Sequence, residues 1–146
     1  MASSAEAPPP FLDTNVLLYL LSSDAAKADR AEALLAAGAT IGVQVLNEFA
    51  SVASRKLKMP WPEIAEVLGL IRSRCAVRDL SVAVHDAALA LAARHRFAWY
   101  DALIVAAALD AGCTLLFSED MHHGMKVSGK LTIRNPFAAA KSTRLP

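Results

Sequence analysis

The sequence predicts an α/β fold, a three-layer α/β/α sandwich around a mostly parallel central sheet. Short apolar runs alternate with helical patterns along the chain, which is typical of parallel strands joined by helices. The run 113–117 is dominated by apolar residues, as expected of a strand that is covered on both faces. The expected strands are 11–12, 40–43, 75–78, 113–117 and 130–134, with a polar loop at 118–129.

Apolar residues at helical spacing mark the segments between these strands. Ser23 or Asp24 precedes the second helix and Ser81 precedes the fifth, and both are places for N-cap residues. Gly38 and Gly112 follow helical segments and provide natural stops. The expected helices are 15–21, 25–37, 45–57, 62–72, 82–94 and 101–111.

The composition is that of one globular domain. The chain has 146 residues, of which 55% are hydrophobic and 20% charged, enough for a substantial core. We expect a flexible leader at 1–10, a single domain at 11–137 and a loose tail at 138–146. No apolar run reaches the ~18 residues needed to span a bilayer, so we expect a soluble, cytoplasmic protein.

Charge and cysteine content narrow the expectation further. The net charge is only +1, whereas proteins that hold nucleic acid by bulk electrostatics are usually more basic. An RNA-binding protein of this composition would rely on local patches or bound cations. Cys75 and Cys113 form no paired motif, and we expect buried thiols in a reducing compartment.

Four carboxylates fall where one edge of the sheet is expected. Asp13 directly follows the first strand, and Asp120 follows the strand 113–117. Asp101 opens a helix, and Glu48 lies in the first turns of the helix after the second strand. Ligands of open α/β sheets bind outside the carboxyl ends of the strands. We therefore expect these side chains to converge.

Each acid also has a plain structural interpretation. Asp13 or Asp101 could be a helix cap, and Asp120 could be a turn residue. Glu48 could be a solvated helix residue. Their convergence favours a site, because like charges held together repel and raise one another's pKa. Bound Mg²⁺ or Mn²⁺ would relieve the repulsion and would suit phosphodiester hydrolysis.

Four segments, at 11–17, 44–49, 99–104 and 116–121, carry the acids in this order. Together they resemble the PIN-domain family, and within it the VapC-type toxins of toxin–antitoxin pairs. The resemblance covers nearly the whole chain, from Phe11 to Phe137. It implies the same sandwich fold and a metal-dependent ribonuclease.

The resemblance also implies roles for individual residues. Mg²⁺ or Mn²⁺ would be bound by the acidic set Asp13, Glu48, Asp101 and Asp120. Ser118 would support the last acid or its water, and Asn15 would orient the first aspartate. Glu119 is adjacent to Asp120 and is the one ambiguous position. We prefer Asp120 because it aligns with the motif.

Partners follow from the resemblance as well. VapC-type proteins cut RNA, pair as dimers and bind a cognate antitoxin in a hydrophobic groove.

The Ala-rich stretches 87–93 and 106–109 could leave an apolar face for a homodimer. Trp61 and Trp99 are expected to be core or interface anchors. The candidate RNA contacts are Arg55, Lys56, Arg94 and Arg96.

Three other interpretations remain. One is a catalytically silent PIN-like binding module, which need not bind Mn²⁺. Another is a phosphatase of the aspartyl-phosphate type, disfavoured because Asn15 stands where that chemistry needs a second Asp. A nucleotide-triphosphate enzyme is disfavoured because no phosphate-cradling Gly-rich loop is present.

Overall fold

A six-stranded sheet forms the centre of the computed structural model, which describes residues 7–138. The strand order is β3-β2-β1-β4-β6-β5. All neighbouring strands are parallel except β5 and β6, which are antiparallel. The strands are β1 (Phe11–Leu12), β2 (Ala39–Gly42), β3 (Cys75–Arg78), β4 (Leu115–Phe117), β5 (Lys126–Val127) and β6 (Leu131–Arg134).

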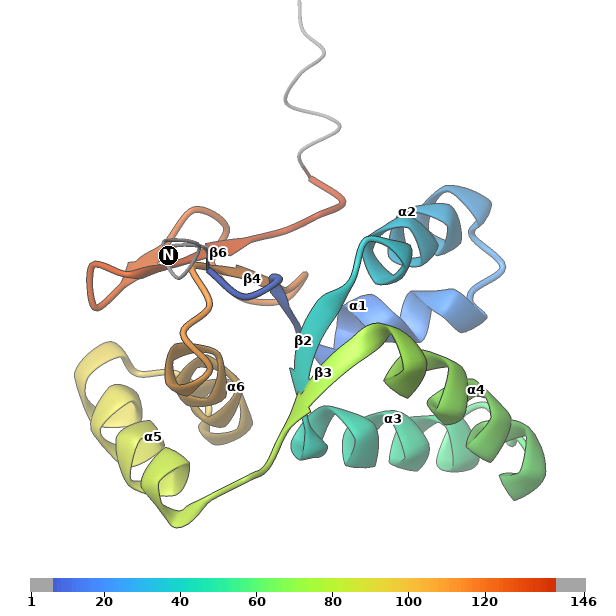
Figure 1. The fold of residues 1–146 in the computed structure, drawn as a ribbon, viewed down its shortest axis with the longest axis horizontal. Helices are drawn as coiled ribbons and strands as arrows, with labels where there is room; N and C mark the ends of the chain where they lie inside the picture. Colours follow the sequence, from blue (N-terminus) through green and yellow to red (C-terminus); the bar gives the residue numbers. More distant parts are fainter. Residues whose placement is uncertain (1–6, 139–146) are drawn as a thin grey trace, which may run out of the picture.

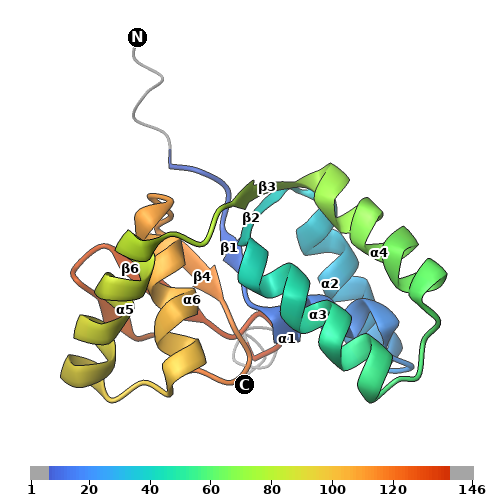
Figure 2. The same cartoon turned by 90° about the horizontal axis from the view of Figure 1, so that it is seen from below.

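Helices cover both sides of the central strands, as Figures 1 and 2 show. Helices α1 to α4 lie together on one side, and α5 and α6 pack against each other on the other side. The predicted three-layer α/β sandwich is therefore confirmed. The helices are α1 (Thr14–Leu18), the 3-10 helix η2 (Tyr19–Leu21), α2 (Ala25–Ala36), α3 (Val43–Arg55), α4 (Trp61–Arg74), α5 (Val82–His95) and α6 (Trp99–Asp110).

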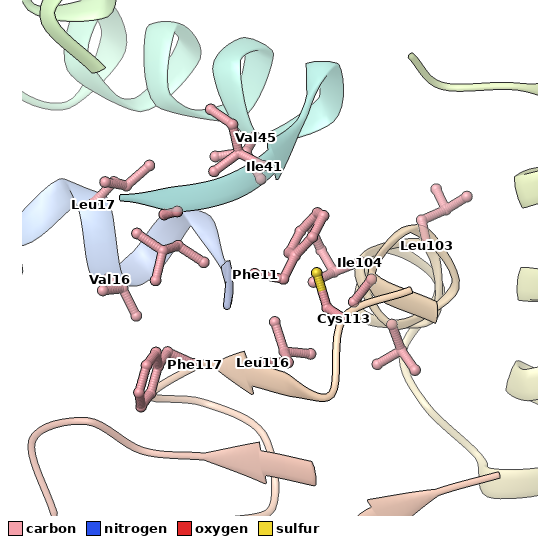
Figure 3. Packing of buried hydrophobic residues seen from close by; sticks show 14 of the residues in the cluster. Phe11, Val16, Leu17, Ile41, Val45, Leu103, Ile104, Cys113, Leu116 and Phe117 are labelled. Atoms are coloured by element: carbon pink, nitrogen blue, oxygen red, sulfur yellow. The ribbon is translucent and has the colours of Figure 1, made fainter. Parts of the chain in front are cut away.

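The core lies around β1, a central strand of only two residues. Phe11 pairs with Thr40 of β2 and Leu116 of β4 and is fully buried. Figure 3 shows its ring in the interior among side chains from the neighbouring strands and helices, including Ile41 and Ile104. Burial of both faces explains why β1 and β4 are apolar throughout rather than alternating.

The predicted capping signals act as expected. Asp24 accepts a hydrogen bond from Lys27 N–H at 3.3 Å, and Ser81 accepts one from Val84 N–H at 3.1 Å. Gly38 and Gly112 follow α2 and α6 with φ of +95° and +81°. Glycine adopts this conformation without the steric cost that a Cβ atom imposes.

Several boundaries differ from the prediction. Residue Val43 begins α3 rather than ending β2, because Gly42 already has the extended geometry of an N-cap. Helix α6 begins at Trp99, so Asp101 lies in its first turn and does not cap it. The predicted loop 118–129 contains β5, which its polar sequence conceals because β5 is a two-residue edge strand.

Two expectations of burial also need correction. Trp61 is 64% exposed and therefore is no core residue in this chain. Cys113 is buried, but Cys75 is only half-buried because β3 is an edge strand of the sheet. Burial raises the pKa of the Cys75 thiol to about 11.

Residues 1–6 of the predicted leader and 139–146 of the predicted tail lie outside the described residues. The described part of the leader contacts the domain. The Pro9 carbonyl accepts hydrogen bonds from Thr40 Oγ1 at 2.8 Å and Cys113 Sγ at 3.3 Å. Within residues 7–138, no helix has the length and apolar character needed to cross a membrane.

Replacing Phe11 with alanine should lower the free energy of unfolding by about 3–5 kcal/mol, because it leaves a cavity at the centre of the sheet. Urea unfolding followed by circular dichroism measures this. Trp61→Ala is the matched control, since that ring is exposed, and it should cost about 1 kcal/mol or less. Equal losses in the two variants would contradict the described packing.

Candidate active site

The carboxyl ends of β1 and β4 bring the first polar residues together. Asp13 follows β1, and its N–H donates to the Phe117 carbonyl at 3.0 Å. Ser118 follows β4, and its hydroxyl donates to Asp13 Oδ2 at 2.8 Å. Thr14 N–H donates to Asp13 Oδ1 at 2.7 Å. Asp13 therefore caps α1 and also belongs to the cluster, so the two interpretations of this residue are compatible.

The environment of Asp13 disfavours its charge. The residue is only 6% exposed, and burial raises its pKa from 3.8 to about 6. Hydrogen bonds from Ser118 and Thr14 oppose this increase in pKa, whereas the charges of Asp101 and Glu48 add to it. A buried carboxylate beside two other acids favours the binding of a cation, because a nearby positive charge stabilises the ionised form.

Glu48 reaches the cluster from α3, where donors hold both of its oxygens. Thr14 Oγ1 donates to Glu48 Oε1 at 2.5 Å, and Gln44 Nε2 donates to Glu48 Oε2 at 3.0 Å. Asp101 reaches the same place from the first turn of α6 and is half-buried. Burial raises the pKa of Asp101, and the charges of Asp120 and Glu48 raise it further.

Asn15 links the two ends of the motif set. Its Nδ2 donates to Asp120 Oδ2 at 3.1 Å and lies 3.5 Å from Asp13 Oδ2. Its Oδ1 accepts from Glu119 N–H at 3.1 Å. One amide thus connects the first turn of α1 with the loop after β4, and it contacts both Asp13 and Asp120.

The four predicted acids line one open cleft of about 330 Å³. Within residues 7–138, Arg55 is the one basic residue that lines it, and its Nε donates to Ser51 Oγ at 3.1 Å. The cleft is lined by Asp13, Thr14, Asn15, Leu18, Glu48, Ser51, Val52, Arg55, Asp101 and Asp120.

Glu119 is directed away from this cluster. Lys27 Nζ donates to Glu119 Oε2 at 2.9 Å, and Tyr19 hydroxyl donates to Glu119 Oε1 at 2.7 Å. Burial alone would raise the pKa of Glu119, but the hydrogen bonds from Lys27 and Tyr19 bring it below its ordinary value. Of the two adjacent acids, Asp120 is the one that lines the cleft, so it is the better candidate for a site residue.

The other predicted RNA contacts lie elsewhere. Lys56 is the C-cap of α3, Arg94 is in the last turn of α5, and Arg96 follows α5 with a left-handed φ of +60°. All three are exposed, but in the described structure they are not among the residues that line the acidic cleft. Their contact with RNA therefore stays a prediction, and it would involve surface outside this cleft.

Two contributors to the site, Thr14 and Gln44, were not predicted. Thr14 directly follows the first acid, and Gln44 precedes Glu48 by four residues in α3. Residues four apart share one face of a helix, so the Gln-x-x-x-Glu spacing was an available signal. The contact of Thr14 with Glu48 joins different elements and had no signal in the sequence.

The donor chemistry of the cleft fits a hard divalent cation. Carboxylate oxygens are the ligands that Mg²⁺ and Mn²⁺ prefer, and the raised pKa values of Asp13 and Asp101 reflect uncompensated burial and like charge. Among the side chains of residues 7–138, however, no three His, Cys, Asp or Glu are gathered closely enough to hold a metal ion. Ligation by three acids would require side-chain adjustment within the cleft.

The sequence matches the family model described as the PIN domain over residues 11–124. This match spans all four acidic segments and most of the chain. The chain belongs to the PIN-domain family. Among proteins with curated descriptions, none matches this PIN domain by sequence.

Solved structures agree with this assignment at the level of the fold. A sarcin–ricin loop cleaving toxin, VapC20 of Mycobacterium tuberculosis, has a TM-score of 0.61 and 21% identity, covering 75% of this chain and 90% of its own. A toxin–antitoxin complex from Klebsiella pneumoniae has a TM-score of 0.63 and 19% identity, covering 87% and 97%. VapBC2 from Rickettsia felis, bound to a fragment of promoter DNA, has a TM-score of 0.63 and 20% identity, covering 86% and 96%.

Replacing Asp13 with asparagine should stabilise the metal-free PIN domain above pH 7. The change in the pKa of Asp13 from 3.8 to about 6 corresponds to about 3 kcal/mol, which is the largest gain expected. Between these pH values the folded state binds more protons than the unfolded state, so wild-type stability falls as pH rises. The advantage of the variant should therefore shrink below pH 6 and vanish near pH 4.

Urea unfolding in EDTA across pH 4 to 8 measures this difference. Asp110→Asn is the control, because Asp110 is an exposed residue at the far end of α6. A difference between wild type and Asp13→Asn that is the same at every pH would contradict a raised pKa at Asp13.

Proposed function

We propose that this PIN domain is a divalent-metal-dependent endoribonuclease that hydrolyses RNA phosphodiester bonds as the toxin of a toxin–antitoxin pair. The observation that carries the proposal is the convergence of four acids from separate elements on one cleft. Membership of the PIN family and the likeness in fold to VapC toxins support it. VapC20 cleaves the sarcin–ricin loop, and this is the reason for proposing RNA as the substrate.

In this proposal Asp13, Asp101 and Asp120 hold Mg²⁺ or Mn²⁺, and Glu48 binds a second cation or orients water. When bound, such an ion supplies a Lewis acid and an activated water for attack on phosphorus. Ser118 and Thr14 donate to Asp13 and keep both of its oxygens in place. Asn15 keeps Asp120 at the same distance from Asp13 while substrate enters.

Arg55 is the proposed contact of the protein with the phosphate backbone of RNA. It lines the rim of the cleft on α3, one helical turn beyond Ser51. An arginine beside an acidic cleft can bind a phosphate next to the scissile one, which positions RNA without selecting sequence. Lys56, Arg94 and Arg96 would contribute only to a longer substrate.

An antitoxin is the proposed protein partner. An apolar groove of about 350 Å³ shares Asn15, Leu18 and Val52 with the acidic cleft. A second groove, of about 290 Å³ and lined by Leu35, Val67 and Leu70 among others, continues from it through Leu21. A segment with apolar side chains lying along both grooves would end at the acidic cleft, where a basic side chain would be favoured.

A homodimer is proposed through α5. The alanines of α6 at 106 and 108 are buried within the domain, and Ala107 and Leu109 are half-buried, so this stretch offers little apolar surface. On α5 only Val84, Ala88 and Leu91 are buried, while Val82 and Leu89 are 76% and 52% exposed. This outer face is the part of the Ala-rich sequence that a second copy would cover.

The proposed location is the cytoplasm, where RNA and reduced cysteines such as Cys75 and Cys113 are found. A catalytically silent PIN-like binding module is the second candidate. It is favoured by the lack of any ready group of three metal-holding side chains within residues 7–138. Titration with Mn²⁺ separates the two, since a silent module needs no metal.

Purified protein incubated with total RNA and Mg²⁺ or Mn²⁺ should produce discrete fragments, and EDTA should abolish them. Asp101→Asn should lower the cleavage rate about 100-fold or more, equivalent to about 3 kcal/mol of transition-state stabilisation. Asp110→Asn, on the same helix but outside the cleft, is the matched control and should cleave at the wild-type rate.

Cleavage that persists in Asp101→Asn would refute the assigned site. A folded protein that neither cleaves RNA nor binds Mn²⁺ in calorimetry would support the silent module instead.

Replacing Leu89 with arginine should convert a dimer into a monomer, because the charge would be buried between the two copies of α5. Sedimentation velocity at micromolar concentration measures the change in mass. Leu70→Arg is the matched control, since Leu70 is exposed to a similar extent on α4, and it should remain dimeric. A monomeric wild-type protein would contradict the proposed interface.

A further inference from the structure

Gln44 is a buried amide next to the acidic cleft but outside its lining. It lies in the first turn of α3 and is only 8% exposed. Its Nε2 donates to Glu48 Oε2 at 3.0 Å and to the Tyr100 carbonyl at 3.2 Å. Tyr100 precedes Asp101, so one side chain connects the helix of the second acid with the helix of the third.

The orientation of this amide follows from its neighbours. Both groups that it faces, a carboxylate and a carbonyl, accept hydrogen bonds and cannot donate them. Turning the amide over would direct its oxygen at two acceptors, so Nε2 must face Glu48 and Tyr100. The remaining oxygen, Gln44 Oε1, is the one buried side-chain nitrogen or oxygen within residues 7–138 that has no hydrogen-bond partner.

Burial of an unpaired oxygen is unfavourable for folding. A side chain of similar length without polar atoms, such as methionine, would fill the same space without this cost. Local stability therefore does not account for glutamine at position 44. The two hydrogen bonds that Gln44 donates account for it, because they hold the Glu48 oxygen that Thr14 does not contact and connect Glu48 to the first turn of α6.

We propose that Gln44 is a positioning residue that sets the placement of Glu48 relative to Asp101 and so prepares the cleft for a divalent cation. The inference rests on the proposed function. Thr14 and Gln44 each hold one oxygen of Glu48, which leaves the carboxylate a single orientation. Residues that orient metal ligands in this way typically contribute about 10–100-fold to metal affinity.

The test is calorimetric titration of the full-length protein with Mn²⁺ alone. Gln44→Met should remain folded yet bind Mn²⁺ about 10-fold more weakly than wild type. Asn47→Met is the matched control, because Asn47 lies on the same helix beside Glu48 but is exposed, and its Mn²⁺ affinity should equal that of wild type. In a Glu48→Gln background, Gln44→Met should change the affinity less than twofold, because Gln44 acts through Glu48.

Wild-type affinity in Gln44→Met, or an equal loss of affinity in the Glu48→Gln background, overturns the proposal. If Gln44→Met does not fold, Gln44→Leu removes the donor without adding a charge, and the same titration decides. A wild-type protein that binds no Mn²⁺ overturns the proposed function instead. The link between Gln44 and Glu48 is then tested by urea unfolding of the wild type, Gln44→Met, Glu48→Gln and the double variant. Additive effects of the two substitutions on the urea midpoint would overturn that link.

Discussion

The point at which β1 ends determines the arrangement of the whole site. The strand has two residues, both fully buried, and pairs on either side with β2 and β4. The next residue, Asp13, still donates its N–H to the sheet at Phe117, and its carboxylate accepts hydrogen bonds from Thr14 N–H and the Ser118 hydroxyl. The acid is thus fixed by backbone hydrogen bonds that are part of the fold. The other three acids approach it on elements that pack against the same strands.

This constraint explains the electrostatics of the cleft. An aspartate on a surface loop would keep its ordinary pKa, but Asp13 lies where water is largely excluded. Ser118 and Thr14 offset part of the cost of its charge. The remaining cost is retained in the folded protein at neutral pH, and a positive ligand in the cleft would offset it without protonating the acid.

The fold was accessible from the sequence because its signals are local. Apolar runs marked the main strands, and residues such as Ser81 and Gly112 marked helix ends, since caps depend on neighbouring residues only. Edge strand β5 was missed because a two-residue pairing has no periodicity. The convergence of the four acids was also predictable, because parallel strands place their carboxyl ends at one edge.

The hydrogen bonds that hold the acids were harder to predict from the sequence. The pairing of Glu119 with Lys27 and Tyr19 joins residues about 100 positions apart, and no pattern in the sequence indicates it. The left-handed conformation of Arg96 at the end of α5 likewise had no signal in the sequence. Long-range side-chain contacts of this kind become visible only once the elements are placed in space.

The double role of Asp13 has an evolutionary consequence. The backbone uses an oxygen at this position to cap α1, whereas the proposed function needs a negative charge there to hold a cation. Asparagine supplies the first without the second, and Asp and Asn codons differ by a single nucleotide. If the proposed function holds, a folded but inactive form of this domain is therefore one nucleotide change away. Relatives of this chain that have lost their chemistry should keep the fold and carry an amide at this position.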